Sequence, residues 1–477
     1  MACVLSTALF LAAPCLSAQN LADSRTVRDA YRLFEEREFE EAAEVLESLH
    51  KDGALGASQA ALLGMVYLNL ERIDDANWAA KLAVWLDPDD YLTMLLQGNL
   101  ALLDEDFPEA EAIFSRARIL YPNRSEAVNG MTAAIAGDAV RLLDAGAYGR
   151  AADRFGDALA YQPENHRLLL GRIAALGRTG RAAELESAYR AYLLLVPNNA
   201  DMHASLGTHL FDRGRRAEAL HHLERAVELD TANPRAFLVL GRIAAEEDVR
   251  HEARSLIHEA IGKAVRLYGR YRLEATRLIQ ESRELSNTAD EQAMERLKEL
   301  SEAAEQPRRI LEEALASLPG LYSDEQDLAE DLARLSEWYP SSAALRQALA
   351  ETYVRAGRGE EAEQVWEELI RRTPLNFEGH LGLGRSRMEA GDYHEASLSL
   401  RRALDISPGT EAIYATLQEV YRRWGREEGF LEILEQRMLK DGYNPLLYRF
   451  AAEAAQNVGL PEKAEEYRRR AEELEEY

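Results

Sequence analysis

The histidines are the residues of this chain whose type and grouping could support chemistry. His203, His209, His221 and His222 lie close together in the sequence. They are accompanied by no cysteine, no His-Glu-x-x-His pair and no second histidine at i+4, which are the spacings that zinc sites use. The sequence also lacks the Gly-x-x-x-x-Gly-Lys-Ser/Thr phosphate loop and the Gly-x-Ser-x-Gly nucleophile motif. We therefore expect a protein that is not an enzyme, with no catalytic residue, no metal and no cofactor.

Length and composition narrow the class of protein further. The 477 residues exceed what one hydrophobic core supports, so several domains or a repeat array are expected. Acidic side chains outnumber basic ones by 83 to 56, and the net charge of −27 disfavours nucleic acid as a partner. A hydrophobic content of 47% is ample for a folded chain, while 14 prolines and 8% aromatic residues favour helices over many short strands.

The first residues have the character of an export signal. No charged side chain precedes Asp23, and an apolar run is followed by the small residues that precede a cleavage site. We expect a signal peptide over residues 1–18. Two alternatives remain open, a lipid anchor through Cys15 and an uncleaved tail. No other stretch is long and apolar enough to span a bilayer, so we expect no membrane span after signal removal.

Prolines and small residues recur with a period of 34 residues. The prolines that keep this spacing are Pro88 and Pro122, Pro163 and Pro197, and Pro340, Pro374 and Pro408. Glycine lies 24 residues before three of them, at Gly64, Gly98 and Gly384, and alanine follows each glycine by 12 and 19 residues. A proline ends a helix, and small residues let two helices approach closely. The period therefore predicts pairs of helices.

This pattern resembles the tetratricopeptide repeat, with Gly64, Tyr67, Ala76, Ala83 and Pro88 in one segment as an example. The resemblance implies an all-α fold, a right-handed superhelical solenoid of about twelve helix-turn-helix repeats. Each repeat would bury its apolar stripe only by stacking on its neighbours. The pattern covers nearly the whole chain.

Two irregularities divide the expected array. Pro122 and Pro163 are 41 residues apart, which predicts a helix extended by two turns over about 125–145. A second interruption, 268–308, separates an N-terminal array at 19–267 from a C-terminal array at 309–477 that ends in a charged capping helix. Two long helices are expected near 253–285 and 289–305. They fit either a stretched repeat or a lateral hairpin.

The resemblance also implies where a partner binds, because positions 2, 5, 9 and 12 of each first helix line the concave surface in this family. The N-terminal groove is then largely apolar, with a more polar wall farther along. The residues predicted to contact a partner are Met65, Leu68, Leu92, Leu95, Asn99, Leu102, Arg235 and Arg242. The alternative is that the chain's own neighbouring repeat or its leader covers this strip.

Together these features predict a scaffold or adaptor of the bacterial cell envelope that holds a peptide or helix of a partner protein in its concave groove. The leader predicts export, with the periplasm as the destination. Two other functions fit the sequence: an assembly factor for outer-membrane export or surface polysaccharide, and a cytoplasmic adaptor.

Overall fold

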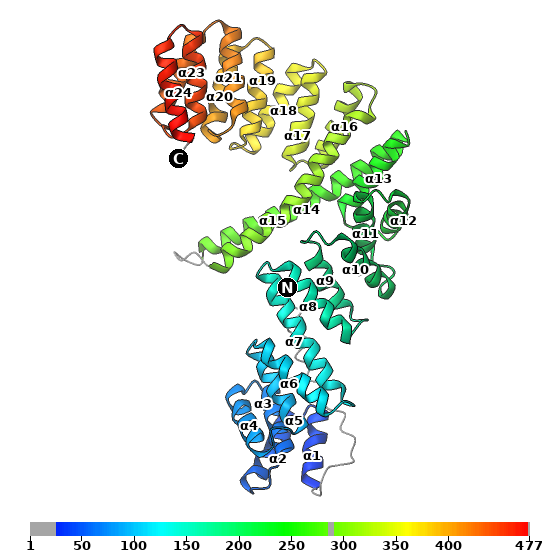
Figure 1. Ribbon diagram of the computed structural model, residues 1–477. Helices are drawn as coiled ribbons and strands as arrows, with labels where there is room; N and C mark the ends of the chain where they lie inside the picture. The colour runs from blue at the N-terminus through cyan, green and yellow to red at the C-terminus, as the bar shows by residue number, and fades with distance from the viewer. Residues whose placement is uncertain (1–24, 285–290, 476–477) are drawn as a thin grey trace. The chain divides into compact units, whose positions relative to one another are not determined.

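The computed structural model describes residues 25–284 and 291–475. Within these ranges the chain forms twenty-four α-helices and one short 3-10 turn, with no β-strand (Figure 1). The expectation of an all-α helical-repeat solenoid is confirmed. The predicted signal peptide, together with Cys3 and Cys15, lies outside the described residues.

The chain divides into two compact units, Met1–Arg213 and Gly214–Tyr477, called here the N-terminal and C-terminal units. The division lies inside the predicted array at 19–267. The helices of the N-terminal unit are α1 (Arg25–Glu35), α2 (Phe39–Lys51), α3 (Ala57–Asn69), α4 (Ile73–Leu86), α5 (Tyr91–Leu103), α6 (Phe107–Leu120), α7 (Ser125–Asp144), α8 (Tyr148–Tyr161), α9 (His166–Leu176), α10 (Ala182–Leu195) and α11 (Ala200–Asp212).

The 34-residue period determines where these helices begin and end. Pro88, Pro122 and Pro163 each follow the end of a second helix, α4, α6 and α8, because proline cannot continue a helix. The first helices α5, α9 and α11 begin at polar caps. The Asp90 carboxylate accepts a hydrogen bond from the backbone N–H of Thr93 at the start of α5. The extended helix expected over about 125–145 is α7, Ser125–Asp144.

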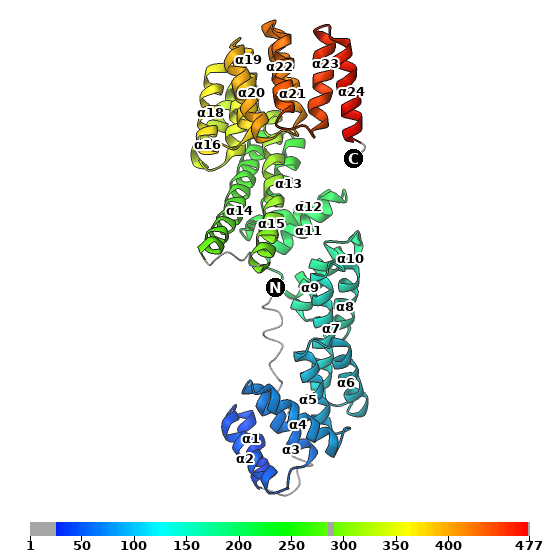
Figure 2. The ribbon, with the colours of Figure 1, turned by 90° about the vertical axis from the view of Figure 1, so that its left-hand side faces the viewer.

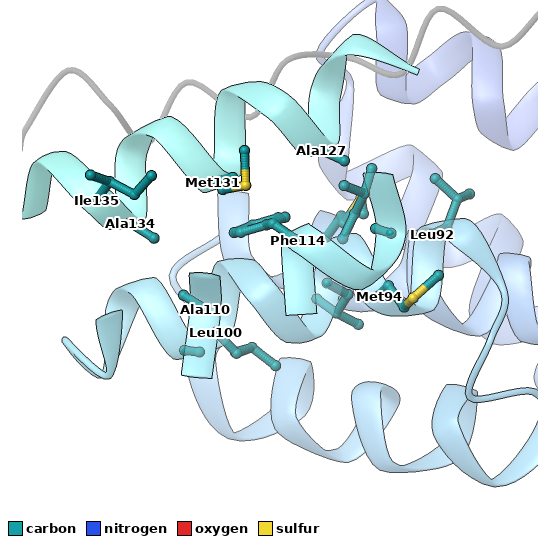
Figure 3. Close-up of a cluster of buried hydrophobic side chains, with 14 of the residues drawn as sticks. Leu92, Met94, Leu100, Ala110, Phe114, Ala127, Met131, Ala134 and Ile135 are labelled. Carbon is teal, nitrogen blue, oxygen red and sulfur yellow. The ribbon is translucent and has the colours of Figure 1, made fainter. Parts of the chain in front are cut away.

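Phe114 of α6 shows how the small residues of the period are used. Its side chain is only 1% exposed and lies beneath α7, beside Met131 (Figure 3). Gly98 of α5 and Gly130 of α7 lie against the same ring, and a Cβ atom added at either glycine would overlap it. Glycine is therefore needed at both positions for three helices to pack on one phenyl group.

The C-terminal unit continues the array and contains the two longest helices. Its helices are α12 (Arg216–Glu228), α13 (Pro234–Glu246), α14 (Arg250–Glu284), α15 (Glu291–Ser317), α16 (Glu325–Trp338), α17 (Ala343–Arg355), α18 (Gly359–Arg372), α19 (Phe377–Glu389), α20 (Tyr393–Ile406), α21 (Glu411–Trp424), α22 (Glu427–Met438), α23 (Pro445–Asn457) and α24 (Pro461–Glu475). The short turn η1 (Pro319–Leu321) precedes α16.

Both long helices are repeat helices that continue beyond the array. The first part of α14 packs on α13 as a second helix, and the last part of α15 precedes α16 as a first helix. Their extensions, residues 268–284 and 291–306, pack on each other, and we call this hairpin the arm (Figure 2). The stretched repeat and the lateral hairpin that the sequence left as alternatives are thus combined in one feature.

The predicted end of the second long helix near residue 305 is wrong. The helix α15 continues through Pro307 to Ser317. An internal proline costs about 3 kcal/mol in a helix. Ile310, Leu311 and Ala314 are buried in the turns that follow, and their burial offsets this cost.

Cutting the chain between Arg213 and Gly214 should leave two folded fragments. Repeats gain stability from contacts with their neighbours, so a break between the two compact units removes little of either core. We expect each fragment to keep its helical circular dichroism spectrum and to melt cooperatively. Loss of helicity in either fragment alone would show that the two units fold only together.

Candidate functional site

The residues predicted to contact a partner do not form one site. Met65 on α3 and Leu92 and Leu95 on α5 are buried, at 2%, 3% and 5% exposure, and belong to the hydrophobic core of the N-terminal unit. The structure does not present these three side chains on a free surface. Their binding role stays a prediction, and their contacts in this structure are packing contacts.

The other five predicted residues are partly exposed and lie in both units. Leu68, Asn99 and Leu102 are on α3 and α5, whereas Arg235 and Arg242 are on α13. The guanidinium Nη2 of Arg242 donates to Glu313 Oε2 at 3.0 Å, which ties α13 to α15. Arg242 therefore has a structural role in the C-terminal unit.

The four histidines have ordinary surroundings. His203 Nε2 lies 3.0 Å from the carbonyl oxygen of Pro197, and His209 Nε2 lies 3.1 Å from that of Ala182. The rings of His221 and His222 contact each other edge to face. Among the described residues no group of three histidine, cysteine or acidic side chains is placed to hold a metal ion.

None of the described helices combines the length and the apolar character that crossing a membrane requires.

A large cleft opens in the C-terminal unit. Its volume is about 1390 Å³, and it lies between the base of the arm, α16 and α17. Three helices each present one face to it, with residues that recur at i, i+3, i+4 and i+7. The residues that line it on these helices include Tyr268, Arg272, Leu273 and Thr276 on α14, Arg308, Leu311, Glu312 and Leu315 on α15, and Ala344, Gln347, Ala348, Glu351, Thr352 and Arg355 on α17.

The cleft has an apolar floor. Val265 of α14, Leu311 of α15 and Leu328 of α16 are buried there, at 8%, 3% and 2% exposure. Two leucines at its edge are exposed, Leu273 by 63% and Leu375 by 78%. Large apolar side chains that face water beside an apolar floor are typical of a protein-binding surface.

The charges around the cleft are only partly paired. Arg308 donates to Glu312 at 2.9 Å and to Glu305 at 2.7 Å, and the hydrogen bonds from Arg308 lower the pKa of Glu305. By contrast, no ion pair involves Glu351, Glu378 or Arg272 among the residues that the structure describes. The Glu351 carboxylate accepts a hydrogen bond from Gln347 at 3.1 Å.

These unpaired charges lie on different walls of the cleft. Glu351 and Glu378 are on the wall made by α17 and the start of α19. Arg272 is on α14, where its guanidinium lies 5.9 Å from the centre of the Tyr268 ring. Arg355 on the α17 wall pairs with Glu325, and Arg308 and Glu312 on α15 pair with each other. Above its apolar floor, the cleft therefore has unpaired acidic charge on the wall of α17 and α19 and unpaired basic charge on α14.

A buried polar network fixes the base of the arm. Asp331 of α16 is 6% exposed, and its Oδ2 lies 2.6 Å from Nε2 of His258 on α14. Tyr322, which follows η1, donates its hydroxyl to the same carboxylate, and Arg334 Nη2 donates to its other oxygen at 3.0 Å. The network joins α14, η1 and α16, and so holds the arm in place beside the cleft.

The network also sets the ionisation of its members. Burial alone would raise the pKa of Asp331, but the hydrogen bonds from His258, Tyr322 and Arg334 outweigh it and lower that pKa to about 2. Burial, together with the hydrogen bond to Asp331, raises the pKa of the Tyr322 hydroxyl. Asp331 is therefore ionised and Tyr322 neutral at neutral pH. Because Asp331 is almost wholly buried, the network holds α14 and α16 together and is not placed to contact a substrate.

Part of the cleft could have been found from the sequence. In the segments 343–376 and 377–410, eight residues occupy the positions that line the concave surface in the repeat resemblance. Four of them line the cleft, namely Ala344, Gln347, Glu351 and Glu378. In the N-terminal segments the same positions include Met65, Leu92 and Leu95, whose side chains are buried in the structure.

Part of the chain matches a known repeat family. The model of the tetratricopeptide repeat family matches residues 62–125, 205–253 and 348–423. The third stretch contains most of α17 and so most of the residues that it contributes to the cleft. Among curated proteins, the BBSome complex member BBS4 of Bos taurus is 24% identical over 164 residues. That match covers 34% of this chain and only 30% of the relative's length.

Solved structures that the chain resembles have TM-scores of 0.35 or less in the three cases given below. YrrB, described as a TPR protein with an unusual peptide-binding site, is 16% identical with a TM-score of 0.30 and covers 39% of this chain and 93% of its own. MamA is 20% identical with a TM-score of 0.25, covering 32% and 89%. The Naa15/Naa10 complex bound to HypK-THB is 17% identical with a TM-score of 0.35, covering 93% and 75%.

Proposed function

We propose that this chain of tetratricopeptide repeats is a non-enzymatic scaffold that binds a segment of a partner protein in the cleft between the arm and α17. The observation that carries the proposal is the cleft itself, about 1390 Å³ in volume and lined by one face of each of three helices. Stacked helical repeats form extended concave surfaces that suit protein partners. A groove with an apolar floor and charged walls fits a helix or peptide with one apolar face.

The length of the cleft favours a short helix or peptide of a partner protein over a small molecule as its ligand. The lining residues extend over twelve residues on α14, from Val265 to Thr276, and over thirteen on α17, from Ala343 to Arg355. At a rise of 1.5 Å per residue these stretches are about 18–20 Å long, or more than three turns of a helix. Leu273 and Leu375 at the edge would be removed from water by such a partner.

We place this scaffold in the bacterial cell envelope, on the strength of the uncharged leader over residues 1–18. The exported protein is then periplasmic, or lipid-anchored if Cys15 is acylated. An assembly factor for outer-membrane export or surface polysaccharide is one specific form of this proposal. N-terminal sequencing of the native protein tests the location, since an intact Met1 would favour a cytoplasmic adaptor.

Site-specific photo-crosslinking in the native host tests the cleft. A photoreactive residue is placed at Gln347 on the α17 wall and, as a control, at Leu439, which is 88% exposed and does not line the cleft. We expect a discrete crosslinked partner from position 347 that is absent from position 439. The same products from both positions, or none from position 347, would contradict binding in the cleft.

A further inference from the structure

We propose that the binding surface continues from the cleft along one side of the arm, and that its occupant is an amphipathic partner helix of about five turns with basic residues on one flank. The inference rests on the proposed function, because it concerns the same site. It adds the length and the charge pattern of the partner.

The arm is held together by its own seam. Tyr271, Ala275 and Leu278 of α14 are partly buried, and Ala293 and Leu300 of α15 are buried. Spacings of three and four residues place these side chains on facing stripes, as in an antiparallel coiled coil. The two helices of the arm therefore need no partner to cover their seam, and any further apolar residue on the arm requires another explanation.

Three such residues exist on the arm. Leu273, Ile279 and Met294 are exposed by 63%, 39% and 61%. Arg272 of α14 and Glu312 of α15 line the cleft. Ile279 lies seven residues after Arg272, and Met294 lies eighteen residues before Glu312. Seven and eighteen residues are two and five turns of a helix, so Ile279 and Met294 lie on the faces of α14 and α15 that form the cleft.

The opposite side of the arm is built differently. There Arg296 of α15 donates to Glu274 of α14 at 2.8 Å and to Glu299 at 2.8 Å. These are exposed ion pairs, and they give that side an ordinary solvated surface. The apolar side chains are thus confined to the side of the arm that is continuous with the cleft.

The geometry sets the length of the occupant. The eighteen residues from Met294 to Glu312 correspond to about 27 Å of helix. An element that contacts both the cleft floor and Met294 must extend over this distance. A partner helix of about eighteen residues with leucine-like side chains every third or fourth position would cover the whole strip.

The charges on the walls of the cleft determine which charges are favoured on the two flanks of the partner helix. Glu351 and Glu378 face the cleft from α17 and α19, and Arg272 faces it from α14. None of the three has an ion pair among the described residues, and the Arg272 guanidinium lies over the Tyr268 ring. A helix that lies between these walls is favoured by basic side chains toward Glu351 and Glu378 and acidic ones toward Arg272. The occupant is therefore a helix with a basic flank and an acidic flank on either side of its apolar stripe.

A displayed library of 18-residue helices tests the proposal on the full-length chain. Leucines are fixed along one stripe, and each flanking position is either lysine or glutamate. We expect the selected helices to carry lysine on one flank and glutamate on the other. The charge-reversed protein Glu351→Lys with Glu378→Lys should bind such a helix at least tenfold more weakly and should select glutamate in place of lysine. Selection of helices with no flank preference would overturn the assigned charge pattern.

The arm is tested with two fluorescently labelled peptides. One is the selected 18-residue helix, and the other is the eleven-residue part of it that binds in the cleft. Ile279→Glu with Met294→Glu should raise the dissociation constant of the long helix at least tenfold and leave that of the short one unchanged. Leu439→Glu is the matched control and should change neither. Equal binding of the long helix by the arm variant and the wild type would overturn the role of the arm while the cleft stands. Failure of the library to yield any binder would instead overturn the proposed function.

A second copy of the chain is the other possible occupant of the apolar side of the arm. Analytical ultracentrifugation of the wild type and of Met294→Glu distinguishes it. The proposal predicts the same mass for both proteins. A wild-type dimer that Met294→Glu converts to a monomer would show that the arm binds its own copy and would overturn the proposal.

Discussion

Phe114→Ala is expected to lower the free energy of unfolding of the N-terminal unit by about 3–5 kcal/mol. The ring is 1% exposed and lies between α5, α6 and α7, so its removal leaves a cavity that the glycines around it cannot fill. Urea denaturation of the 1–213 fragment measures the change. Ile119→Ala on the same helix is the matched control, because Ile119 is 70% exposed and its loss should change stability by no more than about 0.5 kcal/mol.

Gly98→Ala tests the same packing from the other side of the contact. An ideal Cβ at Gly98 would lie 2.5 Å from Cζ of Phe114, so we expect the substitution to cost about 1–3 kcal/mol in the wild type. In the Phe114→Ala background that clash is gone, and alanine gains up to about 1 kcal/mol over glycine in a helix. The sign of the Gly98→Ala effect should therefore reverse. Additive costs in the double variant would mean that the two residues are not in contact.

The glycine and proline positions explain why the fold could be predicted from the sequence. Gly98 is needed because another helix's side chain occupies the space of its Cβ, and Pro122 marks the end of α6 because proline cannot continue it. Both requirements are local to one repeat and recur in the next. A requirement of this kind can be recognised in the sequence from its recurrence, even though the contacts that cause it cannot.

The arm could be predicted only in part. The absence of glycine and proline between Arg270 and Gln306 indicated long helices, and α14 confirms the first. The second was expected to end near residue 305, but α15 continues through Pro307, where the burial of Ile310 and Leu311 keeps it continuous. Propensity is a local term of about 3 kcal/mol, and here tertiary packing, which the sequence pattern does not display, exceeds it.

The cleft was missed for a related reason. Its α17 wall follows the repeat register, which gives Gln347 and Glu351 from the sequence alone. Its other wall consists of the arm, whose placement depends on a contact between His258 and Asp331, two residues far apart in the chain. Neither of them is part of a sequence motif. Contacts of this kind are determined by packing, and they decide which of several possible grooves is open.

Asp331→Ala is expected to cost about 3–5 kcal/mol in the C-terminal unit, because it leaves buried donors without their acceptor. The residues affected are His258 and Tyr322, both of which contact the Asp331 carboxylate. Hydrogen exchange of peptides from α16 in increasing urea measures the loss. Asp327→Asn is the matched control on the same helix, since Asp327 is exposed and its substitution should have little effect.

The contribution of Asp331 should also disappear in acid, and the direction follows from its pKa. The folded protein holds that pKa at about 2, below the ordinary value of 3.8. A lowered carboxylate pKa stabilises the folded state above the unfolded-state pKa, and the stabilisation is lost as the pH falls through the folded-state pKa.

Asp331→Asn cannot ionise, so the difference in unfolding free energy between wild type and variant should narrow by roughly 2 kcal/mol between pH 6 and pH 2. A constant difference for Asp331→Asn would mean that the hydrogen bonds from His258, Tyr322 and Arg334 do not favour the ionised carboxylate, and that the base of the arm is held by packing alone.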